Sequence, residues 1–191
     1  MHNIINRNKK YLKFVFVIIV IGLISGFLYY HFLNSEVQEN IINTIKDYTI
    51  FNSNYIFKDL IITSVILVSS FFIMGIPLAI FFLFYESISL GFLINIFFVA
   101  FKLKGLIYIA LYILINRLLV FFLIILFLQK IINIGRLVIG IILSKNDKTI
   151  RDKLIVNFKN SIYIIIFILI INVIVYFVSP LIFKYLSFLL K

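Results

Sequence analysis

The longest apolar run of this chain covers residues 60–101 and holds a single formal charge, Glu86. As one helix, the run would measure about 63 Å at about 1.5 Å per residue. A hydrocarbon core is only about 30 Å thick, so the run has to cross a membrane, turn and enter it again. Because Glu86 lies close to where this turn is expected, we predict a hydrated cytoplasmic turn at Tyr85, Glu86 and Ser87.

Composition extends this prediction to the whole chain. Of the 191 residues, 64% are hydrophobic and 13% are charged, whereas a soluble domain is about one quarter charged. Too little polar sequence remains for a separate soluble domain. We therefore expect an all-α, polytopic membrane protein with about five transmembrane helices, forming one integral membrane domain over residues 1–191.

Hydropathy and charge together predict the topology. Lys and Arg gather before residue 14 and between residues 130 and 159, and such basic segments stay in the cytoplasm. This bias also accounts for the net charge of +11, because the basic residues flank apolar spans instead of lying on a nucleic-acid-binding scaffold. We expect the N-terminus inside and the C-terminus outside, with spans at residues 14–33, 60–84, 86–101, 106–128 and 162–183.

Two segments between the predicted spans have amphipathic patterns. In the external loop 34–59, Ile41, Ile42, Ile45 and Tyr48 recur at helical spacing. This pattern is typical of a helix on the outer leaflet, or of a contact surface for an external partner. The cytoplasmic segment 130–159 is amphipathic and basic, and its first part is either an extension of the fourth helix or an interfacial helix.

Glycine and proline mark the expected bends and helix contacts. The sequence Gly75-Ile76-Pro77 interrupts the second span, where proline removes a backbone donor, so a kink near Met74 is predicted. A tight outer turn is expected at residues 102–105. Small residues allow membrane helices to approach closely, and the predicted packing positions are Gly22, Gly26, Gly91 and Gly105.

One polar pair is predicted inside the membrane. Arg117 falls near the middle of the fourth predicted span, where an ionised side chain needs a partner or water. Its long side chain can extend toward the side on which Glu86 lies. We therefore predict that Glu86 and Arg117 interact, with Asn116 adding a hydrogen bond between helices.

The sequence contains no recognisable enzyme or cofactor signature. It has no cysteine, and His2 and His31 have no partner at metal-ligand spacing. The chain has four aspartates, namely Asp47, Asp59, Asp147 and Asp152. All four are expected in loops, which excludes an intramembrane aspartyl protease. We predict no catalytic site, no metal and no cofactor.

The order of these features resembles the stage II sporulation protein M family of endospore-forming bacteria. A basic start leads into a helix with Gly22 and Gly26, and an acidic external loop follows. The resemblance then continues through Gly75-Ile76-Pro77, Tyr85-Glu86-Ser87-Ile88-Ser89-Leu90-Gly91-Phe92, Lys104-Gly105-Leu106 and Ile113-Leu114-Ile115-Asn116. It extends over roughly residues 8–185. The abundance of residues with AT-rich codons agrees with a low-GC endospore former.

The resemblance implies a non-enzymatic membrane scaffold that acts in septal wall thinning and engulfment during endospore formation. Its expected partners are the lipid bilayer and two peptidoglycan-degrading proteins, sporulation proteins D and P. Its expected location is the bacterial cell membrane, on the mother-cell side of the sporulation septum. The alternative is a small transporter or permease subunit with a polar path near Glu86 and Arg117. Assembly into a homo-oligomer stays open.

Overall fold

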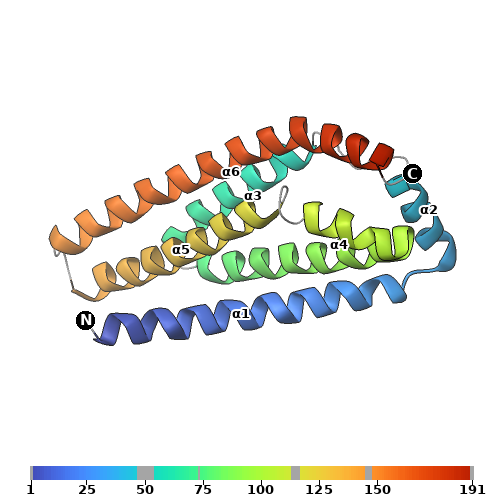
Figure 1. The fold of residues 1–191 in the computed structure, drawn as a ribbon. Coiled ribbons are helices and arrows are strands. Elements are labelled where there is room, and N and C mark those ends of the chain that lie inside the picture. Colours follow the sequence, from blue (N-terminus) through green and yellow to red (C-terminus); the bar gives the residue numbers. More distant parts are fainter. Residues whose placement is uncertain (1, 47–53, 73, 113–116, 145–147, 190–191) are drawn as a thin grey trace. The chain divides into compact units, whose positions relative to one another are not determined.

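The computed structural model describes residues 2–46, 54–72, 74–112, 117–144 and 148–189. Its elements are all helical in this part of the chain (Figure 1). In chain order they are α1 (His2–His31), α2 (Ser35–Lys46), α3 (Asn54–Ser69), the short 3-10 helix η1 (Ser70–Phe72), α4 (Gly75–Tyr112), α5 (Leu118–Ser144) and α6 (Lys148–Leu189).

Four helices among the described residues are long and apolar enough to cross a membrane. The candidate spans are Tyr11–His31, Gly75–Ile107, Leu118–Leu143 and Lys148–Val178. The 16 residues of α3 would measure about 24 Å as a helix, which is shorter than a hydrocarbon core. The chain is therefore an all-α, multi-pass membrane protein, as predicted. Four long candidate spans and the shorter α3 take the place of the five predicted spans.

Large apolar side chains cover the outside of these helices. Phe16 on α1, Phe81 on α4 and Phe167 on α6 are 65%, 65% and 57% exposed. Exposed side chains of this kind on helices of both units are what a lipid environment selects, because acyl chains solvate them and water does not.

The described helices divide into two compact units. The first unit consists of Met1–Asp47 and Leu83–Ile109, and the second consists of Tyr48–Phe82 and Ala110–Lys191. In the first unit α1 and α4 pack in parallel, since Gly22 lies beside Ser87 and Phe27 lies beside Asn95 further along both helices.

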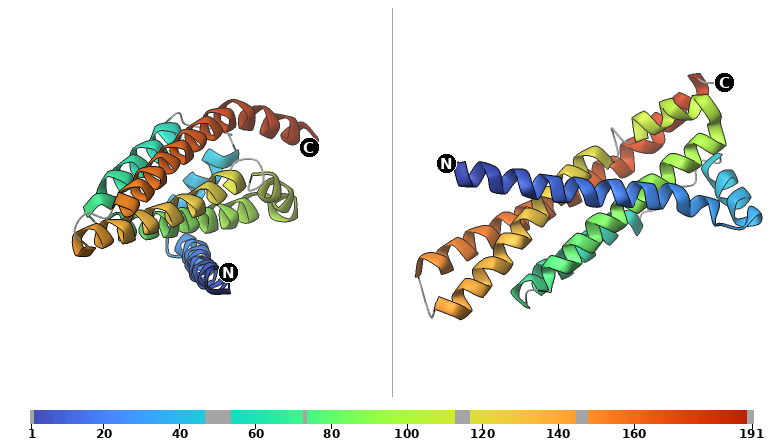
Figure 2. Two further views of the ribbon diagram at one scale, coloured as in Figure 1. Left: turned by 90° about the vertical axis from the view of Figure 1, so that its left-hand side faces the viewer. Right: turned by 90° about the horizontal axis from the view of Figure 1, so that it is seen from below.

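In the second unit α6 packs antiparallel to α3, with Asn172 beside Asp59 and Phe158 beside Phe71. The α5 helix returns along α6 (Figure 2). Five of its fully buried side chains alternate at intervals of four and three residues, which is the spacing of a coiled-coil seam. They are Val120, Ile124, Phe127, Ile131 and Ile134, and Leu128 beside Phe127 is fully buried as well.

The predicted turn at Tyr85-Glu86-Ser87 is wrong, because α4 continues through these residues. The chain reverses earlier, between η1 and α4 (Figure 1). A Cβ atom on Gly75 would lie 2.5 Å from the Cα of Ser70, so only glycine fits this corner. Pro77 then lies in the first turn of α4, where its missing N–H costs no helical hydrogen bond. The predicted kink is thus a hairpin turn.

At the predicted tight turn, residues 102–105, the chain reverses its direction. Lys102 leaves helical geometry with φ 52° and ψ −131°, and the chain doubles back (Figure 2). A Cβ atom on Gly105 would collide with the carbonyl oxygen of Phe97. Glycine is therefore required for the two arms of α4 to pack this closely.

The described residues of the fourth predicted span, 106–128, belong to two elements. Residues 106–112 end α4, and α5 begins at Leu118. The α5 helix then continues through residue 144, so the segment after residue 130 is an extension of the helix and carries the buried Ile131 and Ile134. The last helix starts at Lys148, well before the predicted position 162, and includes residues 148–159 of the predicted basic segment.

Candidate functional site: a glycine crossing and two buried polar contacts

The tightest helix contact in the first unit is the crossing of α1 and α4. Predicted packing glycines from both helices meet there. A Cβ atom on Gly26 would lie 2.8 Å from the Ile88 carbonyl carbon and the Phe92 nitrogen, and one on Gly91 would lie 2.9 Å from the Leu23 Cα. On Gly22 it would collide with the Ser87 Cβ. The two backbones touch directly, which is the use of small residues expected between membrane helices.

Just beyond the glycines, Asn95 of α4 connects the same two helices by hydrogen bonds. Its side chain is 2% exposed. Its Nδ2 donates to the Phe27 carbonyl oxygen of α1 at 2.8 Å and lies 3.3 Å from the His31 Nε2. The Phe27 carbonyl belongs to a helical backbone, so this bond adds a second hydrogen bond to that oxygen. The contact fixes the register of α1 against α4.

Aromatic rings surround this hydrogen bond. The ring of His31 lies 5.9 Å from the Phe27 ring and 5.8 Å from the Tyr30 ring. Phe92 of α4 in turn lies 5.8 Å and 6.2 Å from the rings of Tyr29 and Tyr30. Such tilted and edge-on pairs are the favoured aromatic geometry, and they extend the α1–α4 contact toward the end of α1.

The second unit contains a buried carboxylate, and this corrects the prediction that Asp59 lies in a loop. Asp59 is part of α3 and is 4% exposed. Its Oδ2 accepts a hydrogen bond of 2.9 Å from the Asn172 Nδ2 on α6. Thr63, one turn further along α3, is fully buried and donates to the Asp59 carbonyl oxygen at 2.6 Å. Asn172 thus solvates the carboxylate from the facing helix.

Buried hydroxyl side chains occur in the same unit. Thr63 of α3, Ser70 of η1 and Ser161 of α6 are all fully buried. Ser70 donates to the Leu67 carbonyl oxygen at 2.6 Å, and Ser161 donates to the Asn157 carbonyl oxygen at 2.9 Å. Because these hydroxyl groups are satisfied by nearby backbone carbonyls, burying them costs little.

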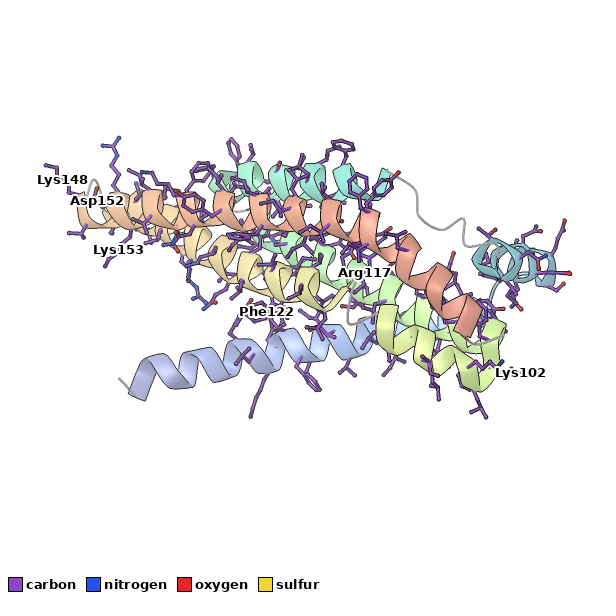
Figure 3. All side chains as sticks on the ribbon, turned by 45° about the horizontal axis from the view of Figure 1, so that its top comes forward. Lys102, Arg117, Phe122, Lys148, Asp152 and Lys153 are labelled. Atoms are coloured by element: carbon purple, nitrogen blue, oxygen red, sulfur yellow. The ribbon has the colours of Figure 1, made fainter. Side chains whose placement is uncertain are left out.

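The predicted polar pair has a different setting from the one expected. Glu86 lies inside α4 and is 3% exposed, so it is not a hydrated turn residue. Arg117 directly precedes α5 (Figure 3). Glu86 belongs to the first unit and Arg117 to the second, and their interaction stays a prediction. Asn116 lies outside the described residues.

The start of α6 is the most strongly charged end of a helix among the described side chains. Lys148, Asp152 and Lys153 lie together there (Figure 3), and all are exposed, as is Arg151. Their exposure agrees with a hydrated end of the bundle. Elsewhere, no group of three His, Asp or Glu residues that could hold a metal ion occurs within the described ranges.

Sequence reasoning missed the residues that make the Asn95–Phe27 and Asn172–Asp59 hydrogen bonds between helices. Asn95, Asp59 and Asn172 each lie in an apolar segment, and the signal that identifies them is spacing. Asn95 follows Gly91 by four residues, and Asp59 precedes Thr63 by four. A polar side chain one turn from a glycine or hydroxyl residue lies on the same helix face, so it would be expected at the same contact.

Comparisons with known proteins add no relative: no protein-family model, no curated protein and no solved structure matches this chain.

Proposed function

We propose that this chain is a non-enzymatic membrane scaffold for a peptidoglycan-degrading complex, acting in septal wall thinning during endospore formation. The observation that carries the proposal is the α1–α4 crossing together with α2. Two spans are locked in register by Gly26, Gly91 and Asn95, and α2 is attached rigidly to the end of one of them. This arrangement presents a polar surface at a fixed position beside the membrane.

The attachment of α2 is specific. Gln38 donates from its Nε2 to the carbonyl oxygens of Tyr30 and Leu33, at 3.0 Å and 2.9 Å. These carbonyls lie at the end of α1, where helical partners run out. The outward side chains of α2, among them Glu36 and Glu39, are exposed, and they provide an acidic surface for a soluble partner domain.

The proposal is tested by capture of sporulation proteins D and P on the purified chain in vesicles. Replacing residues 35–46 by a flexible Gly/Ser linker should reduce capture at least tenfold while membrane insertion persists. The replacement leaves α3, which begins at Asn54, intact. A matched control, Lys148→Ser with Lys153→Ser at the start of α6, should capture both partners normally. Undiminished capture by the linker variant would overturn this scaffold surface.

A transporter subunit is the second candidate, and the buried acids favour it. Glu86 of α4 and Asp59 of α3 are 3% and 4% exposed, and ionisable residues buried between membrane helices commonly mark ion or substrate paths. Exchanging the charges in Glu86→Arg with Arg117→Glu should restore a proton or ion flux that each single change abolishes. An ion-tight liposome containing the unaltered chain would remove this candidate.

A further inference from the structure

The orientation of α2 about its own axis is fixed by Gln38. Because the Gln38 amide binds the Tyr30 and Leu33 carbonyl oxygens, the side of α2 that carries Gln38 faces the end of α1. The backbone closes the same corner, since the Phe32 N–H donates to the Tyr29 carbonyl oxygen at 3.1 Å. The helix therefore lies across the end of a membrane span, with a defined face toward it.

That face is the apolar one. At about 100° per residue, Val37, Gln38, Ile41 and Ile42 fall within an arc of about 140°. The residues on the opposite side are polar and exposed, namely Glu36, Glu39, Asn40 and Asn43. Gln38, Ile41 and Ile42 are half-buried, and Val37 at the edge of the arc is 42% exposed. The hydrogen bonds of Gln38 to the end of α1 thus direct the apolar arc toward the membrane.

Exposed apolar side chains lead along the chain from α1 to the apolar arc. Leu28, one turn from the end of α1, is 49% exposed, and Phe32 in the connection is 82% exposed. Val37 is the next exposed apolar side chain after Phe32. Tyr29 and Tyr30 lie at the same level, as expected where a span leaves the hydrocarbon core. Apolar side chains that continue a span beyond this level meet the boundary between acyl chains and headgroups.

We propose that α2 is an interfacial helix, with Val37 and Ile41 inserted among the lipids around the end of α1 and Glu36 and Glu39 facing water. None of the described side chains on the apolar arc is basic, and the exposed opposite face is acidic. Insertion therefore depends on apolar burial and needs no anionic lipid. The inference does not rest on the proposed scaffold function, because it concerns the bare chain and lipid alone.

The experiment uses the absence of cysteine in the chain. Single Val37→Cys and Glu39→Cys variants of the full chain carry an environment-sensitive fluorophore and are reconstituted in phosphatidylcholine vesicles. We expect lipid-attached nitroxides to quench the label at position 37 at least threefold more than the label at position 39. Aqueous iodide should show the reverse order. Ile21→Cys in the α1 span and Lys153→Cys on α6 are the lipid and water references.

Three outcomes would overturn the inference. The first is quenching at position 37 that matches the water reference at Lys153. The second is protection of the label at position 37 from aqueous iodide that is lost on tenfold dilution of protein in lipid, which would mean that a second copy of the chain covers the helix. The third is protection from iodide that appears only after anionic lipid is added. Equal values in neutral and in 30% anionic vesicles would support insertion by apolar burial.

Discussion

The two units hold their helices together in opposite ways. In the first unit α1 and α4 touch through their backbones, because Gly26 and Gly91 present no side chain. In the second unit α5 contributes a row of bulky buried side chains, among them Phe127 at 1% exposure. The α1–α4 contact is close because no side-chain atoms separate the two backbones, whereas large side chains of α5 fill the space in the second unit.

The difference reflects how membrane helices associate. Lipid tails are as apolar as leucine, so burying an apolar side chain between helices gains little from leaving the solvent. Stability has to come from close packing and from interhelical hydrogen bonds. Substitutions that add atoms should therefore destabilise the α1–α4 glycine crossing, while substitutions that remove atoms should destabilise the buried row of α5. The predictions below test this asymmetry.

The largest effect is expected for Gly26→Ala. The new Cβ would lie 2.8 Å from two backbone atoms of α4, and backbone atoms cannot move aside without separating the helices. We expect a loss of about 3 kcal/mol in the free energy of unfolding, at the upper end for overpacking. The measurement is an SDS titration in bicelles, followed by energy transfer between labels on α1 and α4.

Gly140→Ala is the matched control for that change. A Cβ atom on Gly140 would be 3.8 Å from the Ile150 side chain, which is ordinary contact. Since alanine is the better helix former by about 1 kcal/mol, this variant should be neutral or slightly more stable. If both alanine variants unfold at the same detergent fraction, the backbone contact is not what holds the first unit together.

A smaller loss is expected for Phe127→Ala in the second unit. Phe127 is 1% exposed, and removing its ring leaves a cavity within the α5 seam. Such a change costs about 3–5 kcal/mol in soluble proteins. We expect about 2 kcal/mol here, because an apolar side chain that moves from lipid into a helix contact gains little transfer free energy. Phe122→Ala on the same helix, where the ring is 57% exposed, should change the unfolding free energy by less than about 0.5 kcal/mol.

These two residues also show what a sequence can reveal about such a fold. The apolar runs and the glycines predict an all-α membrane protein and the positions of close contact, because both depend on local composition. They do not separate Phe127 from Phe122. Which phenylalanine is buried depends on the neighbours of α5, and in an evenly apolar helix there is no polar face to indicate it.

The misplaced turn has a physical cause as well. Glu86 is the only charge between residues 60 and 101. The free-energy cost of burying a charge, taken alone, predicts a hydrated position for it. The structure instead turns at Gly75, where backbone geometry requires glycine, and buries Glu86 in α4. In this chain the Gly-x-Pro sequence is the stronger turn signal, because it acts on the backbone itself.

Asn172→Leu tests the hydrogen bond of the second unit. The change leaves the buried Asp59 carboxylate without the amide that now donates to it at 2.9 Å. We expect a loss of about 1.5 kcal/mol, near the upper end for bonds between membrane helices. Replacing both partners, in Asp59→Leu with Asn172→Leu, should recover most of the stability because no buried acceptor is left unsatisfied.

Asn157→Leu is the control for Asn172→Leu. The Asn157 amide donates within α6, to the Lys153 carbonyl oxygen at 2.9 Å, and among the described residues it bonds no other helix. It should change the unfolding free energy by less than about 0.5 kcal/mol. A double variant as unstable as Asn172→Leu would show that side-chain shape, and not hydrogen bonding, decides the α3–α6 contact.

The smallest difference is expected inside the Asn95 contact, and it separates its two acceptors. The Asn95 Nδ2 lies 2.8 Å from the Phe27 carbonyl oxygen but 3.3 Å from the His31 Nε2, and hydrogen bonds weaken with length. Asn95→Leu should therefore cost about 1 kcal/mol. His31→Phe preserves the ring contacts with Phe27 and Tyr30 and should cost about 0.3 kcal/mol, since the shorter bond remains. The same titration measures both values. If His31→Phe proved the more harmful, the register of α1 against α4 would depend on the imidazole, and the backbone bond would be the lesser contact.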